Sequence, residues 1–435
     1  MHLWFVLIIY NLLFPIVFLS LLPGYLIKVF RRGNYKNSFG ERLGFFSLDK
    51  EKKLSQLERP IWIHAVSVGE VNVAKKFIDS LKQIYPNHSI VLSTTTPTGY
   101  SIASGSKADL VFYQPLDFFF IINRVFKLID PSCLVLTEAE VWPNLVNKAH
   151  KKRVEVSLIN ARLSNRSRKR FEKYSFLTSP VLKLLRRVCI QEESDRKVWV
   201  KLGVSSDKIF FTGSIKFDRE NIDSHIEIEE FRNLLKELFR GKQRSVLLAG
   251  STHPGEELMI ARKFKKLKQD FPDLFYMVAP RHVERCKILF EELSKEGLKA
   301  ELRSQLDYER SNQKNSNVID CLIIDTTGEL NVWYHLSDIV IIGKSFLSHG
   351  GQNPVEPIFA GKPVIVGPHM ENFTALVSLL NKYEGISQID DSEMLIQSIS
   401  EMLYRPETAD KMVIRANEAL SCHQGASERT VKLII

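Results

Sequence analysis

The chain has 435 residues, of which 44% are hydrophobic and 25% are charged, so it can form about two or three domains with buried cores. Its five cysteines are odd in number and far apart, with no CxxC pair, which argues against a disulfide framework and a zinc knuckle. Charge is unevenly distributed, because residues 1–213 carry a net charge of +15 and the remainder carries −5.

The N-terminal segment is the most apolar part of the chain. Residues 3–26 contain no charged side chain, and Lys28, Arg31 and Arg32 follow directly. This length is sufficient to cross a bilayer, and without a basic leader or an A-x-A cleavage site residues 1–32 are predicted to be a retained anchor. The basic residues favour a cytoplasmic location for the remaining chain. A full crossing and a helix lying in the membrane interface both fit this segment.

Residues 33–215 are predicted to form a first α/β domain. Apolar strands separated by amphipathic helices indicate βαβ units and a parallel sheet covered on both faces. Residues 216–244 are charged and contain no strand pattern, which predicts a helical linker. The β-rich runs of this domain are residues 61–66, 89–95, 109–114, 133–139, 154–161, 187–191 and 209–214.

Residues 245–435 are predicted to form a second domain of the same class. The fold class is therefore α/β, with two Rossmann-like doubly wound domains and a cleft between them that the carboxyl ends of both sheets face. Ligand-binding residues are expected directly after strands. The β-rich runs of this domain are residues 245–251, 274–280, 321–327, 338–344 and 363–368.

The basic residues of the first half are concentrated in four runs, at residues 28–32, 148–153, 162–170 and 183–187. These runs have no aromatic interleaving and no zinc-finger or helix-turn-helix signature, so nucleic acid is not the predicted partner. Anionic lipid headgroups at a membrane surface are the preferred partner. A solvated helix face explains any single run, but it explains the asymmetry of the whole chain less well.

Three strand ends of the first domain carry candidate catalytic residues. Glu70 stands at the start of a helix, where it either complements the helix dipole or acts as a general base. Glu138 and Glu140 follow a buried strand, and their structural alternative is a pair of acids before a helix that begins with proline. Lys216 follows the last strand, where a fixed cation suits a departing phosphate.

Two strand ends of the second domain suit a nucleotide. Ser251 and Thr252 form a turn of small residues whose backbone N–H groups can cradle a phosphate, although no Walker motif is present. Arg281 and His282 follow the next strand. The His282-x-Glu284 pair has no PCxxC partner, so we predict no metal site.

The stretch SHGGQNPVEPIFAGKPVIVGP follows another strand of this domain. Gly350 and Gly351 allow the backbone to approach a ligand closely. Asn353 and Pro354 are predicted as the N-cap and first residue of a helix whose free N–H groups face a phosphate. Glu356 is then either the acid of a capping box or a carboxylate that binds ribose hydroxyls.

Ten motifs in this order resemble the 3-deoxy-D-manno-oct-2-ulosonic acid (Kdo) transferases of Gram-negative bacteria. They are HAVSVGEV, STTTPTGY, YQPLD, TEAEVWPNL, INARLS, GSIKFD, AGSTHPGEE, APRHVER, DTTGEL and GGQNPVEP with GKPVIVGPHMENF. The likeness extends over essentially the whole chain, anchor included.

The resemblance implies an inverting transferase with the glycosyltransferase B-type fold. Such an enzyme moves Kdo from CMP-Kdo to a lipid A precursor (lipid IVA), or to Kdo already in place, during lipopolysaccharide biosynthesis at the cytoplasmic face of the inner membrane. It implies neither a metal nor a cofactor besides the donor. The first domain would bind the acceptor and residues 245–435 the donor, with the C-terminal helix packing back on the first domain.

The resemblance also implies roles for individual residues. Glu70 corresponds to the general base, and Glu138 and Lys216 correspond to the residues that stabilise the transition state. In the Glu-Ala-Glu tripeptide, Glu140 is the alternative to Glu138. Lys344 departs from the pattern, which has glycine or a small residue there. The expected donor contacts, from the turns and the resemblance together, are Ser251, Thr252, Pro280, Arg281, Gly328, Glu329, Leu330, Gly350, Gly351, Asn353, Pro354, Val355 and Glu356.

Two other functions fit parts of this pattern. A B-type transferase using a UDP-sugar on another membrane lipid would share the glycine-rich loop and Glu356 but not the SVGE and TEAEVWPN motifs. A membrane-anchored nucleotide-binding scaffold without catalytic activity would need the second domain but would have no use for Glu70.

Overall fold

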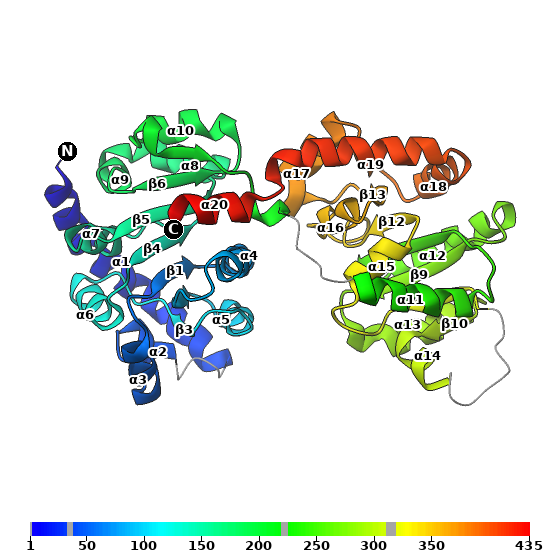
Figure 1. The fold of residues 1–435 in the computed structure, drawn as a ribbon, viewed down its shortest axis with the longest axis horizontal. Helices are drawn as coiled ribbons and strands as arrows, with labels where there is room; N and C mark the ends of the chain where they lie inside the picture. The colour runs from blue at the N-terminus through cyan, green and yellow to red at the C-terminus, as the bar shows by residue number, and fades with distance from the viewer. Residues whose placement is uncertain (1, 33–37, 219–224, 310–318) are drawn as a thin grey trace. The chain divides into compact units, whose positions relative to one another are not determined.

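The computed structural model describes residues 2–32, 38–218, 225–309 and 319–435. Their contacts divide the chain into two compact units, one formed by Met1–Asp218 with Cys422–Ile435 and the other by Arg219–Ser421. Each unit is a parallel β-sheet packed with helices, which confirms the prediction of two doubly wound α/β domains (Figure 1). All five cysteines are free.

The first unit contains a seven-stranded parallel sheet with the order β3-β2-β1-β4-β5-β6-β7. The order reverses between the neighbours β1 and β4, and doubly wound sheets bind ligands at the carboxyl ends of the strands at such a reversal. The strands are β1 (Ile61–Ala65), β2 (Ile90–Thr94), β3 (Leu110–Tyr113), β4 (Cys133–Thr137), β5 (Glu155–Ala161), β6 (Arg187–Ile190) and β7 (Ile209–Phe211).

Alternate residues of β1 serve the two faces of this sheet, as the two-residue period of a strand requires. Trp62 packs in one apolar cluster with Phe126 and Trp199, whereas Ile61 and Ile63 belong to the cluster on the other face. The helices that cover these faces are α1 (Leu3–Arg32), α2 (Ser38–Arg42), α3 (Leu48–Gln56), α4 (Val68–Ile84), α5 (Pro97–Ser104), α6 (Phe119–Ile129), α7 (Pro143–Lys151), α8 (Asn165–Lys173), α9 (Ser175–Leu182), α10 (Arg196–Lys201) and α20 (Ala426–Ile434), with the short 3-10 helices η1 (Glu193–Asp195), η2 (Ser206–Lys208) and η3 (Ile215–Phe217).

The C-terminal segment completes the first unit, and its helix α20 lies beside α4 (Figure 1). The carboxylate of Asp218 accepts hydrogen bonds from Gly425 N at 2.6 Å and Ser427 N at 2.7 Å. Arg429 Nη2 donates to Thr212 O at 2.8 Å. The C-terminus therefore fixes the segment on both sides of η3.

Helix α1 packs along α7 and α9 of the first unit. Its stretch Leu3–Ser20 is long and apolar enough to cross a membrane, with a mean hydropathy of 2.3. Asn11 and Asn144 exchange side-chain hydrogen bonds at 3.1 and 2.9 Å, and the ring of Phe14 contacts that of Phe118 at 5.0 Å. One side of this apolar helix is therefore attached to the domain.

The second unit contains a seven-stranded parallel sheet with the order β10-β11-β9-β8-β12-β13-β14, which reverses between β8 and β12. The strands are β8 (Val246–Thr252), β9 (Phe275–Pro280), β10 (Ala300–Leu302), β11 (Cys321–Ile323), β12 (Ile339–Ile342), β13 (Val364–Val366) and β14 (Ser387–Gln388). The helices are α11 (His225–Leu238), α12 (Glu256–Asp270), α13 (Cys286–Lys295), α14 (Arg303–Glu309), α15 (Leu330–Leu336), α16 (Val355–Phe359), α17 (Thr374–Lys382), α18 (Met394–Tyr404) and α19 (Pro406–Leu420), with η4 (Val283–Arg285), η5 (Glu371–Phe373) and η6 (Ser421–His423), the last at the passage to the first unit.

The strand positions agree with the sequence prediction, but several boundaries and two strands differ. Three strands end earlier than predicted. Strand β4 ends at Thr137 instead of residue 139, β7 at Phe211 instead of residue 214, and β11 at Ile323 instead of residue 327. Strands β10 and β14 were not predicted, because their sequences AEL and SQ form no apolar run. Within the predicted linker 216–244, η3 lies in the first unit and α11 in the second, and residues 219–224 are outside the described residues.

Candidate active site

Glu70 lies in the first turn of α4, at the carboxyl end of β1, and is 6% exposed. Its Oε2 accepts hydrogen bonds from Val66 N at 3.0 Å and Thr137 Oγ1 at 2.8 Å, and its Oε1 accepts one from Ser67 Oγ at 2.9 Å. Ser67 also caps α4 by accepting a bond from Glu70 N at 3.3 Å. Glu70 therefore lies at the start of a helix, as predicted, and its hydrogen bonds fix the orientation of its carboxylate.

Glu138 and Lys216 form an ion pair with 2.6 Å between Oε1 and Nζ, and their side chains are 25% and 34% exposed. The attraction between the two is that of opposite charges, because no donor among the described residues makes a hydrogen bond to Glu138 Oε1 with suitable geometry. Glu138 directly follows β4 and has a left-handed φ of 54°. Lys216 Nζ also lies next to Gly69, since a Cβ atom added to this glycine would be 4.0 Å from the nitrogen. The predicted catalytic residues thus gather where the first sheet reverses.

Glu140 belongs to the same group of carboxylates, and its N–H donates to Thr137 O at 3.2 Å. Burial, together with the charges of Glu70 and Glu138, raises the pKa of Glu140 to about 7. At neutral pH this side chain is therefore protonated in a large fraction of molecules, which reduces the repulsion among the three carboxylates. Glu138, rather than Glu140, is the carboxylate paired with Lys216.

The backbone around Lys216 is held by buried polar contacts. Asn160, which is fully buried in β5 and has φ 52°, accepts a hydrogen bond from Ile215 N at 3.0 Å through Oδ1. Lys76 Nζ donates to Asp218 O at 3.0 Å. These bonds fix the residues on both sides of Lys216, so its ammonium group is presented from a rigid turn.

In the second unit, β8 ends in a bulge next to β9. Gly250 pairs with Ala279 and Thr252 with Pro280, which leaves Ser251 between the two pairs with a left-handed φ of 55°. Bulges of this kind re-aim side chains at functional sites. The predicted phosphate turn therefore has an irregular backbone, as expected for a binding loop.

Tyr334, on α15, is buried beside Ser251, one of the predicted donor contacts. Its hydroxyl is hydrogen-bonded to the side chain of Ser251. Burial and then the charge of Glu356 raise the pKa of Tyr334, whereas the charge of Arg281 acts in the opposite direction. Ser251 therefore contacts a buried hydroxyl at the reversal of the second sheet, and the charges of Glu356 and Arg281 act on the same group.

Glu256 is fully buried at the start of α12 and holds the loop that follows β12. Its Oε2 accepts hydrogen bonds from His253 N at 2.9 Å and Lys344 N at 2.6 Å. Its Oε1 accepts bonds from Ser345 N and Phe346 N, both at 3.0 Å. One carboxylate thus joins the loops after β8 and β12, the two strands at the reversal.

Basic side chains surround the same loops. The rings of His253 and His282 meet at 5.8 Å between centroids, and Gln352 Nε2 lies 3.4 Å from His253 Nε2. Burial lowers the pKa of His253, the charge of Glu256 opposes this, and the charges of Lys344 and His282 add to it. With its lowered pKa His253 is an uncharged hydrogen-bonding group at neutral pH, and Lys344 carries the positive charge that suits an anionic ligand.

The remaining predicted donor contacts lie on two further loops. Gly328 has φ 89°, and Glu329 directly precedes α15, where its Oε2 accepts hydrogen bonds from Thr326 Oγ1 at 2.6 Å and Trp333 Nε1 at 3.3 Å. Arg303 Nε lies 3.3 Å from the same oxygen.

Asn353 donates from Nδ2 to Glu356 Oε1 at 3.0 Å and accepts a bond from Val355 N at 3.1 Å. Helix α16 begins at Val355, one residue later than predicted, because Asn353 bonds the N–H two residues on and forms a turn before the helix. Pro354 is therefore the cap residue instead of the first helical residue. The bond between the Asn353 and Glu356 side chains is therefore not that of a capping box, and Glu356 is exposed at the surface of the unit.

Three residues of these sites were not singled out from the sequence as site residues. Thr137 was visible only as the end of a strand, Glu256 only as an acid at a helix start, and Tyr334 only as part of an amphipathic helix. A polar residue ending a buried strand is the one signal that points to Thr137. The partners of the other two are far away in sequence, so no local pattern identifies them.

Comparisons with known proteins identify the family and the fold of the chain. Residues 37–219 match the model of the family described as 3-deoxy-D-manno-octulosonic-acid transferase (kdotransferase). The chain is similar in fold to a UDP-GlcNAc 2-epimerase from Neisseria meningitidis, with 16% identity over 86% of this chain and 98% of that one and a TM-score of 0.55. It is also similar to a glycosyltransferase from Rickettsia africae, with 12% identity over 87% and 98% of the two chains and a TM-score of 0.52. A 3-deoxy-D-manno-octulosonic acid transferase of Haemophilus influenzae is 31% identical over 404 residues, which are 92% of this chain and 91% of that protein, and the chain therefore belongs to the Kdo transferase family of glycosyltransferases.

Proposed function

We propose that the protein transfers Kdo from CMP-Kdo to a hydroxyl group of a lipid A precursor, with inversion at the anomeric carbon. The observation that carries this proposal is the group formed by Glu70, Glu138 and Lys216 at the reversal of the first sheet, in a member of the Kdo transferase family. A base beside a fixed ion pair is the machinery that such a displacement needs.

In the proposed reaction Glu70 accepts the proton of the acceptor hydroxyl. The hydroxyl oxygen forms a bond to the anomeric carbon of Kdo while the bond from that carbon to the phosphate oxygen breaks, and CMP leaves with the electron pair. Lys216, held by Glu138, stabilises the negative charge that develops. Because the leaving group is already a phosphate monoester, basic side chains can stabilise it, and we propose that the step itself uses no metal or further cofactor.

The second unit is proposed to bind CMP-Kdo. The phosphate is expected near the bulge at Ser251, where Lys344 supplies a positive charge beside the imidazole of His253. The exposed carboxylate of Glu356 is proposed to accept hydrogen bonds from the ribose hydroxyls. The bond from Asn353 supports this role, because it orients the carboxylate before the nucleotide binds.

A pocket of about 260 Å³ in the first unit supports a lipid acceptor. Val6 and Leu13 of α1 and Leu182 of α9 line it, together with Val141 and Pro143. Val141 directly follows Glu140 and Pro143 lies two residues further on, so this apolar pocket adjoins the carboxylate group along the chain. A hydroxylated lipid can place an acyl chain in such a pocket while its hydroxyl meets a carboxylate.

The free side of α1 supports attachment to the inner face of the cytoplasmic membrane. Large apolar side chains are exposed there, and the neighbouring start of α6 exposes Phe119 and Phe120, each 58%. A contiguous apolar face on a helix whose other face packs on the domain is typical of a protein that lies in one leaflet. We therefore propose interfacial attachment by α1. The exposed apolar residues of α1 are Trp4, Phe5, Ile8, Leu12, Leu13, Ile16, Val17 and Leu19.

The test is a mass-spectrometric assay of purified enzyme with CMP-Kdo and a tetraacylated lipid A precursor. Wild-type enzyme is expected to add the mass of one or more Kdo residues. Glu70→Gln is expected to lower turnover by about 100-fold or more while CMP-Kdo binding persists, whereas the exposed-residue control Glu58→Gln is expected to retain turnover. Unchanged turnover in Glu70→Gln would refute the mechanism, and a product with a UDP-sugar but none with CMP-Kdo would refute the donor.

A further inference from the structure

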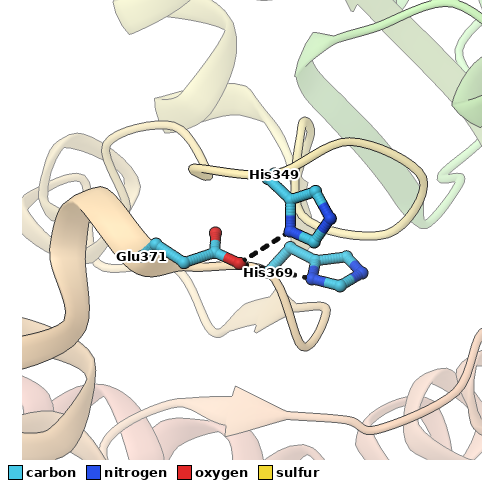
Figure 2. Close-up of side chains that lie close together, drawn as sticks. All are labelled: His349, His369 and Glu371. Atoms are coloured by element: carbon cyan, nitrogen blue, oxygen red, sulfur yellow. Dashed lines mark hydrogen bonds and ion pairs between the residues drawn. The ribbon is translucent and has the colours of Figure 1, made fainter.

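The second unit contains a cluster of two histidines and a glutamate that the sequence did not reveal. His349 lies on the loop between β12 and α16, whereas His369 and Glu371 lie between β13 and α17. Figure 2 shows the two imidazoles side by side with their Nδ1 atoms toward the carboxylate of Glu371. About twenty residues separate His349 from the other two, so no motif with metal-ligand spacing appears in the sequence.

The geometry of this cluster is close to that of three ligands of one metal ion. His349 Nδ1 and His369 Nδ1 lie 2.9 and 3.4 Å from the same oxygen, Glu371 Oε1, and the three ligand atoms all lie within 4.8 Å of one another. Zinc bonds to nitrogen and oxygen of about 2.0–2.1 Å give edges of about 3.3 Å in a tetrahedron. Two of the three edges therefore have nearly the required length before any metal binds.

We propose that His349, His369 and Glu371 bind a Zn²⁺ ion, with the fourth position open to water or another ligand. Two imidazoles and a carboxylate form a zinc ligand set, whereas Mg²⁺ and Ca²⁺ prefer oxygen ligands alone. The side chains of His349 and Glu371 are 79% and 52% exposed, so the ion can enter from solvent without unfolding the loop. This proposal does not depend on the proposed transfer reaction.

The backbone around the cluster supports the carboxylate. Glu371 Oε2, the oxygen not shared by the histidines, accepts a hydrogen bond from Gly350 N at 2.6 Å. Gly350 has φ 113°, a conformation that suits glycine, and its carbonyl accepts a bond from Asn372 N at 3.0 Å. Such outer contacts orient metal ligands. A bound ion would therefore join the loop after β12 to the loop after β13.

The test uses full-length, untagged protein freed of metal with a chelator. Titration with Co²⁺ as a spectroscopic substitute for Zn²⁺ is expected to give one site per chain with the visible absorption of tetrahedral cobalt, and Zn²⁺ is expected to displace it. His349→Ala, His369→Ala and Glu371→Gln are each expected to weaken the affinity by about 100-fold or more. His88→Ala, which removes an exposed imidazole of the first unit, is the matched control and is expected to bind as wild type.

A second measurement guards against loss of folding in the variants. Hydrogen exchange of the amides in residues 345–352 is expected to slow on addition of Zn²⁺ to wild type but not to His349→Ala, whose exchange in β8 and β9 should match wild type. The proposal is wrong if cobalt gives no tetrahedral spectrum at millimolar concentration. It is equally wrong if the three substitutions leave the spectrum unchanged, because the metal then binds elsewhere.

Discussion

Replacing Glu256 with glutamine tests whether one buried carboxylate organises the donor side of the protein. The substitution preserves the shape of the side chain but removes its charge and turns one acceptor oxygen into a donor NH₂ group. Glu256 accepts hydrogen bonds from His253, Lys344, Ser345 and Phe346, two on each oxygen. Whichever way the new amide turns, two of these N–H groups lose their acceptor and face another donor.

The expected cost follows from these lost bonds. A hydrogen bond to a charged group contributes about 1.5–3 kcal/mol, so losing two of them destabilises the loop by about 3–6 kcal/mol. A domain is stable by only roughly 5–15 kcal/mol in total. Glu256→Gln is therefore expected to open the loop after β12 in a measurable fraction of molecules and to weaken CMP-Kdo binding with it.

Hydrogen exchange read by mass spectrometry measures this effect at the residues concerned. Exchange at residues 344–346 is expected to accelerate by about 100-fold or more in Glu256→Gln, since each 1.4 kcal/mol is a factor of ten. Asp270→Asn, an exposed acid at the end of the same helix, is the control and is expected to leave exchange unchanged. If the two variants differ by less than about threefold at residues 344–346, the buried carboxylate does not hold the loop.

Two further predictions concern the first unit. The pKa of Glu140 is raised from 4.5 to about 7 in the folded state. The contribution of this group to the stability of the folded state is therefore largest below pH 4.5 and is lost as the pH rises through 7. Glu140→Gln is therefore expected to gain thermal stability relative to wild type between pH 5 and pH 8, and a difference that is constant across this range would contradict the assignment. Thr137→Val, which removes the hydroxyl 2.8 Å from Glu70 Oε2, is expected to lower kcat by about tenfold with an unchanged KM for CMP-Kdo, and equal kcat values in the two enzymes would contradict the positioning role.

The fold was predictable from the sequence because each strand is a short apolar run bounded by polar turns. Strand β1 shows why, since Ile61, Trp62 and Ile63 form an apolar run whose side chains are buried on both faces of the sheet. The strands β10 and β14 were missed for the opposite reason, because their sequences, AEL and SQ, contain polar residues and form no apolar run.

The candidate sites were predictable only in part. Residues that directly follow a strand, such as Glu70 and Glu138, could be identified because the position itself has a meaning in a doubly wound fold. Glu256 and the pair His349 and His369 could not, since their partners come from other loops. Whether a helix-start acid bonds only its own helix or reaches the N–H groups of a loop 88 residues away depends on packing.

The backbone conformation adds a separate argument for these sites. Five non-glycine residues with positive φ lie in turns after helices, where this conformation is common: Arg59, Asp130, Arg153, Arg240 and Glu384. The others in the described part of the chain, Glu138, Asn160, Ser251 and Lys344, lie at or near the carboxyl ends of strands.

A left-handed conformation costs an L-residue about 1–2 kcal/mol, which glycine would avoid. Three of these four strand-end residues make a side-chain contact that glycine would lose. Glu138 pairs with Lys216, Asn160 holds the backbone next to it, and Ser251 binds a buried hydroxyl. Lys344 has φ 58°, a conformation that suits glycine. A lysine at that position retains the strain and adds a positive charge beside His253, as expected if the loop binds the phosphate of a nucleotide.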